Sequence, residues 1–406
     1  MATGQFNSIG SIDLAKTPDL LGKTSFAAMI TRIMPNGQAP LFGFTSMLKD
    51  ETALQIEHGY FAKVMLFPSL TNGGATALAA ATTISGVSTA NLVPGMILQN
   101  PTTMENILVI SVDSATDITV RRAVGTIAAA NIASGETLYQ VGNAKEEGST
   151  APQALRLDPI RITNLTQIIR NAWALTGTAQ ATEVIAGDGN LAENKQDCAA
   201  FHAADIEKAI FFSQKYNGTL NGQPLRTMDG LVSIITTNAA ANIHTAGTTT
   251  NATQFEAMLD PVFDQTTDPK HANERILFVG AKAMTVINQI ARKNGTYQLM
   301  DGQTSWGLQF STFKTTRGTF RLIEHPLFNS NAVWSAMAVA VDLVTFNLAY
   351  LAGRKTASKV YNAQGQEATN NAVDATGGTL TTECTTVCRN PAAYAVIKGL
   401  TAASVG

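Results

Sequence analysis

The chain has 406 residues and a formal net charge of −2, and only 14% of its residues are charged. Soluble domains usually carry about 25% charged residues, so we infer that much of the surface faces something other than bulk water. The near-neutral charge argues against a dedicated nucleic-acid binder and against a polybasic membrane-surface protein, because both depend on clustered Lys and Arg.

The cysteine content indicates a reducing compartment. The chain has 3 cysteines, Cys198, Cys384 and Cys388. A disulfide framework needs more cysteines and an even number of them, so we expect free thiols in a protein that is made in a reducing cytosol. Residues 1–20 show no basic region followed by an apolar region, and this pattern predicts no secretory signal.

The first part of the chain leads from an arm into a β-rich insertion. Residues 1–24 are polar and aperiodic, which favours an extended arm. Between about 75 and 145, short apolar runs alternate with turn signals, a pattern typical of a small barrel or sandwich inserted in a larger domain. Four runs carry this pattern: Met96–Leu98, Ile107–Val112, Ile118–Val120 and Leu138–Val141.

A long helix is predicted over residues 191–216. Asn190 and Glu193 have the spacing of a capping box, and Asn217-Gly218 supplies a C-terminal stop. At 1.5 Å per residue the helix would span ~39 Å.

The two faces of this helix differ in character. One face carries an apolar stripe at helical spacing: Ala199, Ala203, Ile206 and Ile210. Phe201 and Phe212 fall on the opposite face, among the charged residues Asp197, Asp205, Lys208 and Lys215. Bulky aromatic residues are unusual on a solvated face, so we expect this side to contact something other than the helix's own core.

Residues 231–330 predict a mixed α/β domain, because strand and helix patterns alternate there. The expected elements are a strand over 231–237, a helix opened by a Thr253–Glu256 capping box, a strand over 276–279, a helix over 281–294, and a hairpin formed by 310–313 and 320–323.

The most apolar stretch of the chain is 336–352. Asp342 and Asn347 interrupt it, which favours two buried strands over a membrane span. A closing strand is expected near 379–388.

A search for catalytic or metal-binding patterns finds none that is complete. Gly22-Lys23-Thr24 resembles the end of a phosphate-binding loop, but the glycine this motif needs at position 17 is a threonine. The five histidines do not have metal-ligand spacing, and His202 is expected to be structural or interfacial. We therefore predict no enzyme, no cofactor and no metal site.

The order of segments resembles the tailed-bacteriophage major capsid proteins of the Johnson fold, in the subgroup whose extended loop carries a small β insertion. Four passages carry the resemblance: Pro35–Leu48 with Gln55–Val64, Val120-Arg121-Arg122 with Glu147-Gly148, Asn164–Ile168 through Gly177–Ala181 with Ala192–Phe211, and Thr382–Pro391 with Ala395–Gly399.

The resemblance implies an α+β fold with an arm, an extended loop, a spine helix, and peripheral and axial domains. The implied boundaries are 1–24 for the N-terminal arm; 25–64, 150–230 and 331–406 for the peripheral domain; 65–149 for the extended loop, with its β-barrel-like insertion at about 75–145; 191–216 for the spine helix; and 231–330 for the axial domain.

The function that the resemblance implies is that of a major head protein. Its copies would form the hexamers and pentamers of an icosahedral shell around double-stranded DNA, without sequence-specific contact to the DNA. Further partners would be a portal and scaffolding or decoration proteins, with no membrane involved. Assembly would take place in the host cytoplasm, and the protein would end in the virion. We expect Phe201, Phe212, Arg121 and Arg122 at subunit interfaces.

Three other functions remain open at this point. An encapsulin-like bacterial compartment would use the same fold to enclose protein cargo. A secreted β-rich adhesin or surface-layer protein is a hypothesis from another class, disfavoured by the free cysteines and by the absence of a signal pattern. An enzyme ranks third, because no catalytic constellation is visible.

Overall fold

The computed structural model describes residues 39–47, 50–63, 67–151, 156, 158–181, 191–265, 273–294, 304–305, 308–309, 311–361 and 375–404. The chain divides into two compact units, a larger one of residues 1–60 with 163–406 and a smaller one of residues 61–162. The expected arm, the Gly22-Lys23-Thr24 motif and the Asn190 cap lie outside the described residues.

The smaller unit is built on one six-stranded antiparallel sheet. Its strands are β3 (Ser69–Thr71), β4 (Thr83–Ser85), β5 (Met96–Gln99), β6 (Asn106–Val112), β7 (Asp117–Arg121) and β8 (Thr137–Asn143), in the order β3-β8-β5-β6-β7-β4. An isolated bridge between Asn72 and Gly86 joins the ends of β3 and β4. The sheet therefore closes on itself, and the inserted domain is a barrel rather than a sandwich.

The barrel has a core of its own. Side chains alternate inward and outward along each strand, and the inward ones form one apolar cluster: Leu70, Ile84, Leu92, Val93, Met96, Leu98, Ile107, Val109, Ile118, Val120, Ile132 and Leu138. At the closing bridge, a Cβ on Gly86 would lie 2.1 Å from Leu70 Cδ1. Only glycine leaves room there for the core leucine.

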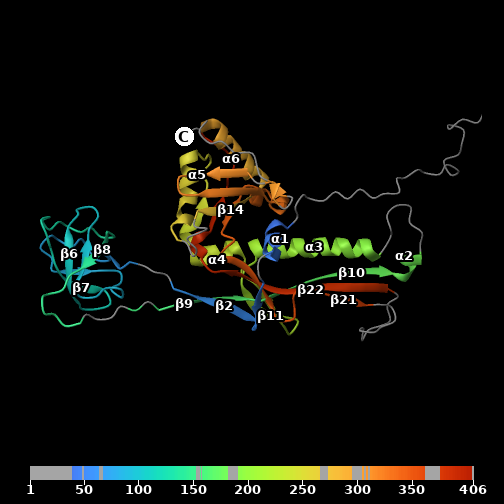
Figure 1. Ribbon diagram of the computed structural model, residues 1–406, viewed down its shortest axis with the longest axis horizontal. Coiled ribbons are helices and arrows are strands. Elements are labelled where there is room, and N and C mark those ends of the chain that lie inside the picture. The colour runs from blue at the N-terminus through green and yellow to red at the C-terminus, as the bar shows by residue number, and fades with distance from the viewer. Residues whose placement is uncertain are drawn as a thin grey trace, which may run out of the picture. The chain divides into compact units, whose positions relative to one another are not determined.

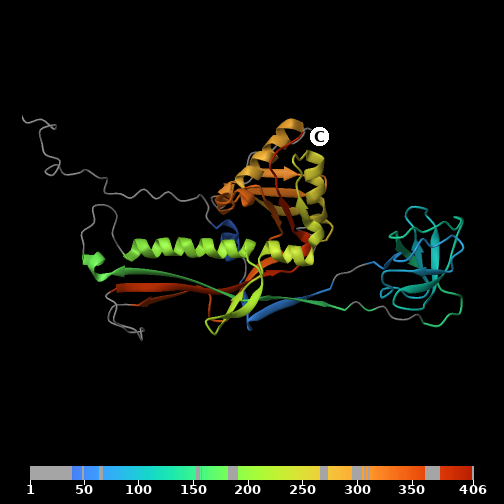
Figure 2. The same ribbon diagram turned by 180° about the vertical axis from the view of Figure 1, so that it is seen from behind.

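The larger unit contains a five-stranded sheet that is covered by a helix. Its strands are β1 (Glu51–Ala53), β20 (Phe346–Leu351), β22 (Ala375–Cys388), β10 (Gln167–Thr176) and β21 (Ala357–Tyr361). The first half of β22 pairs with β10 and β21, and the second half pairs with β20. Helix α3 (Leu191–Phe212) runs along this sheet (Figures 1 and 2). A separate two-stranded sheet joins β2 (Glu57–Ala62) to β9 (Ile160–Leu165).

A six-stranded mixed sheet forms the middle layer of the rest of the larger unit. Its order is β13 (Ile243–Thr245), β23 (Ala395–Lys398), β19 (Ala338–Val341), β14 (Glu274–Val279), β18 (Thr319–Glu324) and β17 (Ser311–Lys314). The regions 231–330 and 331–406 thus share one sheet. Their division into an axial and a peripheral domain stays a proposal.

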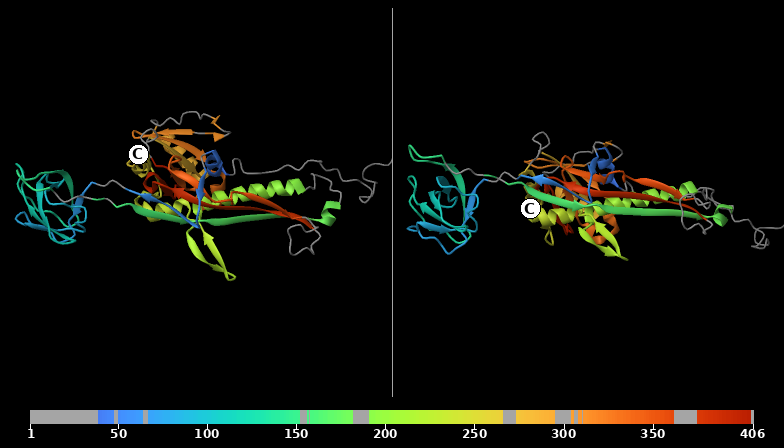
Figure 3. Two further views of the ribbon diagram at one scale, coloured as in Figure 1. Left: turned by 60° about the horizontal axis from the view of Figure 1, so that its bottom comes forward. Right: turned by 90° about the horizontal axis from the view of Figure 1, so that it is seen from below.

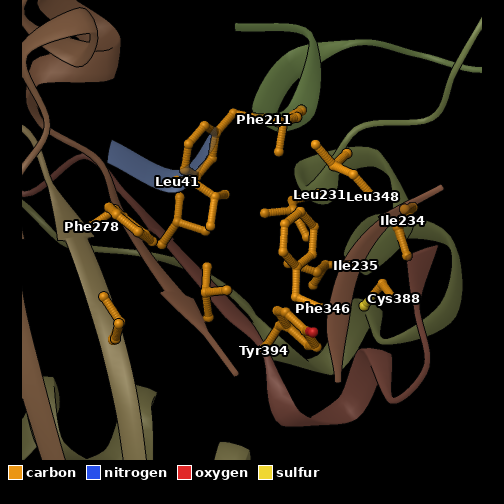
Figure 4. Close-up of a cluster of buried hydrophobic side chains, with 14 of the residues drawn as sticks. Leu41, Phe211, Leu231, Ile234, Ile235, Phe278, Phe346, Leu348, Cys388 and Tyr394 are labelled. Carbon is orange, nitrogen blue, oxygen red and sulfur yellow. The ribbon is translucent and has the colours of Figure 1, made fainter. Parts of the chain in front are cut away.

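Each face of this sheet packs on a different core, because alternate residues of β14 point to opposite sides. Leu277 and Val279 join the cluster that holds α5 (Ala252–Leu259) and α6 (Ala281–Asn294). Ile276 and Phe278 join the cluster that holds α3 and α4 (Leu231–Asn238). Figure 4 shows this second core, where Phe211, Leu41 and Phe278 lie together. Shorter elements are α1 (Pro40–Met47), α2 (Gly177–Ala181), α7 (Ala332–Ser335), β15 (Thr304–Ser305) and β16 (Leu308–Gln309).

Three local predictions were wrong. The long helix ends at Phe212 rather than at 216, because the chain turns there into a β-hairpin formed by β11 (Tyr216–Leu220) and β12 (Gln223–Thr227). Residues 231–237 are helical rather than extended, since Leu231, Ile234 and Ile235 reach the core at helical spacing. The cap of α5 is Asn251 with Gln254, not Thr253 with Glu256.

Other predictions are confirmed. Helix α6 covers 281–294 as expected. Strands β17 and β18 form the predicted hairpin. The apolar stretch 336–352 contains the two buried strands β19 and β20.

Among the described residues, no helix is long and apolar enough to span a membrane.

Candidate subunit interface

Helix α3 buries a stripe that includes polar side chains. Ile206 and Ile210 are fully buried, as the apolar pattern predicts, but Ala199 is exposed and Ala203 is only half-buried. His202 and Cys198 occupy the buried positions one and two turns before Ile206, respectively. Alanine side chains are too small to indicate clearly which side of a helix is buried. The buried face of α3 is therefore rotated from the expected one, toward Cys198 and His202.

His202 connects the helix to the five-stranded sheet. Its Nδ1 lies 2.6 Å from Asn171 Oδ1 on β10, and its Nε2 lies 2.7 Å from Thr382 Oγ1 on β22. The Asn171 amide donates to Asp205 at 2.9 Å, so Oδ1 is left to accept from the histidine. Burial lowers the pKa of His202, against the opposing effect of Asp205. A neutral ring that donates at Nδ1 and accepts at Nε2 fits both partners.

Glu207 holds α1 against α3. Its fully buried carboxylate accepts from the backbone amides of Leu41 at 2.8 Å and Phe42 at 2.7 Å. These amides belong to the first turn of α1, where no intrahelical acceptor exists. His325 Nε2 donates to the same carboxylate at 2.8 Å. One side chain therefore ties α1, α3 and the loop after β18 together.

The structure separates the two aromatic residues that we predicted on the exposed face of α3. The Phe201 side chain is 67% exposed and points away from the core. Phe212 instead packs inside the chain, stacked on Trp334 with ring centroids 4.2 Å apart and close to Phe328. Phe201 remains a candidate interface residue, whereas Phe212 contributes to the core.

Arg121 and Arg122 also have different environments. Arg121 is exposed at the end of β7. Arg122 pairs with the fully buried Glu105, with its Nε 2.8 Å and its Nη2 2.7 Å from the two carboxylate oxygens. It also donates to the backbone oxygens of Leu78 and Ala130. The structure thus gives Arg122 a role inside the barrel and leaves only Arg121 available at its surface.

Glu105 accepts from two further donors, the backbone amides of Ala123 at 3.0 Å and Ala130 at 3.1 Å. Burial alone would raise the pKa of Glu105, but the hydrogen bonds from Arg122 and from these amides outweigh burial and lower it. A single carboxylate therefore organises the loop after β7.

No catalytic or metal-binding constellation is visible in the part of the chain that the structure describes. No group of three or more His, Cys, Asp or Glu side chains there could hold a metal ion. Cys198, Cys384 and Cys388 are buried, free thiols, and burial raises the pKa of each, to about 12 for Cys384 and Cys388. Such thiols are inert rather than nucleophilic.

Comparison with known proteins identifies the family. The model of the SU10 major capsid protein family matches residues 2–401. The chain is also 37% identical over 402 residues to the major capsid protein of Pseudomonas phage PaMx41, covering 96% of both chains. The chain belongs to the SU10 major capsid protein family. It is a phage major capsid protein with the α+β capsid fold, and this identification supports the phage hypothesis over the encapsulin and adhesin alternatives.

Solved structures similar to this capsid chain have low sequence identity to it. Mycobacterium phage Adephagia matches at 10% identity and a TM-score of 0.47, over 98% of this chain and 99% of that one. The SrpI encapsulin of Synechococcus elongatus matches at 11% identity and a TM-score of 0.44, over 62% of this chain and 81% of that one.

Sequence reasoning missed Glu105, Glu207 and the β11–β12 hairpin. Glu207 stands between Ile206 and Ile210 on the buried side of α3, and Glu105 comes directly before the apolar alternation of Ile107 and Val109; these positions are the signal that could have pointed to them. Asn221-Gly222 is a strong hairpin signal. Asn217-Gly218, four residues earlier, is a similar signal, and it was interpreted as the end of the long helix.

Proposed function

We propose that copies of this chain assemble into hexamers and pentamers of an icosahedral shell that encloses a double-stranded DNA genome. The observation that carries the proposal is the match to a phage major capsid family along residues 2–401. The protein would act by binding its own copies, without catalysis or a cofactor. Assembly would take place in the host cytoplasm, with a portal and with scaffolding or decoration proteins.

The composition supports a shell subunit. A net charge of −2 over 406 residues limits the electrostatic repulsion between many identical neighbours. A net charge of this size also predicts little specific contact with DNA, so the genome would be held by containment. Individual contacts can be weak, because the many contacts of a closed shell add together.

We place Phe201 at a contact between subunits. It is a large apolar side chain on an exposed helix face, and it belongs to none of the apolar clusters that the described residues form. Covering it would remove apolar surface from water, whereas Asp at this position would bring a charge into the contact.

The test compares Phe201→Asp with Lys195→Gln, which makes the same change in net charge at an exposed position on another side of α3. We expect both variants to fold with the circular dichroism of the unmodified chain. In sedimentation and electron microscopy, Lys195→Gln should still form shells and Phe201→Asp should not. Normal shells from Phe201→Asp would refute this assignment.

A further inference from the structure

The hairpin that follows α3 is a separate two-stranded unit. β11 and β12 pair only with each other among the described strands, and Figure 3 shows them projecting from the larger unit. Asn221 and Gly222 form the turn with φ of 51° and 75°. Positive φ at both central residues of a two-residue loop is the geometry of a type I′ turn, which Asn-Gly favours. The local sequence therefore specifies this hairpin.

One face of the hairpin carries three large apolar side chains and is open. Gly218 lies opposite Leu225, and Leu220 lies opposite Gln223. Since alternate residues share a face, Tyr216, Leu220 and Leu225 project on the same side, together with Gln223 and Thr227. Their side chains are 52%, 58% and 40% exposed. The other face carries Asn217, Thr219, Pro224 and Arg226.

Gly218 shapes this apolar face. A Cβ at position 218 would lie 2.2 Å from the Tyr216 Oη and 2.4 Å from its Cζ. The Tyr216 ring therefore lies over Gly218, which is paired with Leu225 on the other strand.

Hydrogen bonds fix the base of the hairpin to the neighbouring strands. Lys215 Nζ donates to the Thr163 oxygen at 2.9 Å, and the Met228 amide donates to Gln167 Oε1 at 3.1 Å. An isolated two-stranded hairpin is marginally stable in water, so this anchoring helps to keep its open face in one place. A fixed face loses little entropy when a partner covers it.

We propose that this apolar face of Tyr216, Leu220 and Leu225 binds an uncharged, apolar surface of a second copy of the same chain. The proposal rests on the proposed function. Three partly exposed side chains offer far less than the roughly 800 Å² per partner that a stable two-protein complex buries. The area suits a contact that is weak alone and is repeated in every subunit of a shell.

The first experiment replaces the apolar face without changing net charge. Leu220→Gln with Leu225→Gln is compared with Asn217→Gln with Thr219→Gln on the opposite face. We expect the Leu variant to need at least tenfold more protein for shell assembly, and the control to assemble like the unmodified chain. Equal assembly by the two variants would overturn the proposal.

The second experiment does not depend on the Leu variant, so it can be interpreted even if that variant folds poorly. p-Benzoylphenylalanine replaces Leu225 or, as a control, Thr219, and the assembled particles are irradiated. A cross-link between two copies from position 225, and little from position 219, is the expected result. Cross-links from position 225 only within one chain, or to a different protein, would overturn the proposal. If the unmodified chain forms no shells, the proposed function fails instead, and the two failures are distinct.

Discussion

At the scale of single residues, two buried carboxylates organise loops and helix ends. Glu105 receives Arg122 and two backbone amides in the barrel. Glu207 receives the first amides of α1 and His325. In each case the carboxylate satisfies donors that burial would otherwise leave without an acceptor, so its removal costs more than the contact itself is worth.

We predict that Glu105→Gln destabilises the barrel by about 3 kcal/mol, because Arg122 would then be a buried charge without a counter-charge. Hydrogen exchange at the β6 and β7 amides in the full chain measures this loss. Glu147→Gln, at an exposed position with the same change in charge, should leave exchange unchanged. Equal protection in the two variants would show that the ion pair does not hold the loop.

The same carboxylate predicts an acid dependence. The pKa of Glu105 in the folded chain lies below its ordinary value of 4.5, so its contribution to stability is full above that value and is lost as the pH falls through the folded pKa. Amide protection in the barrel should therefore drop between about pH 5 and pH 3 by more in the unmodified chain than in Glu105→Gln. Parallel pH curves for the two would contradict this.

At the scale of elements, α3 has one face that stabilises the chain and another that is open. Phe212 packs on Trp334 and Phe328, whereas Phe201 is exposed. Both were predicted on one face, because they lie eleven residues apart on the helix. Phe212 is the last residue of α3, where Phe328 and Trp334 from a distant part of the sequence cover it.

We therefore predict that the same substitution destabilises the monomer strongly at one position and hardly at the other. Phe212→Ala should lower the free energy of unfolding by about 3 kcal/mol, and Phe201→Ala should change it by less than about 0.5 kcal/mol. Urea unfolding followed by circular dichroism measures both. Similar losses for the two variants would mean that Phe201 also supports the fold.

Elements with a strong local pattern were predictable from the sequence. Helix α6 and strand β14 combine clear periodicity with burial on one or both faces, and the barrel strands are separated by glycine turns. Residues 231–237 failed because their β-branched side chains favour a strand locally, while contacts with the core impose a helix. The roles of Glu105 and Glu207 depend on donors far away in the sequence, which no local pattern reveals.

At the scale of the whole molecule, the shortage of charge is consistent with a surface made for contact between copies. Some of the few charged side chains are buried inside the chain, among them Glu105 with Arg122, and Glu207. Apolar side chains meanwhile remain open on α3 and on the β11–β12 hairpin. In a free monomer such surface is a liability, and we propose that neighbouring copies cover it in a shell.

Electron microscopy of the purified chain over a range of salt and protein concentrations shows whether this protein forms a capsid shell. We expect closed shells whose reconstructed wall contains this chain in rings of five and six copies. Monomers or irregular aggregates under every condition, with no closed shell, would contradict it.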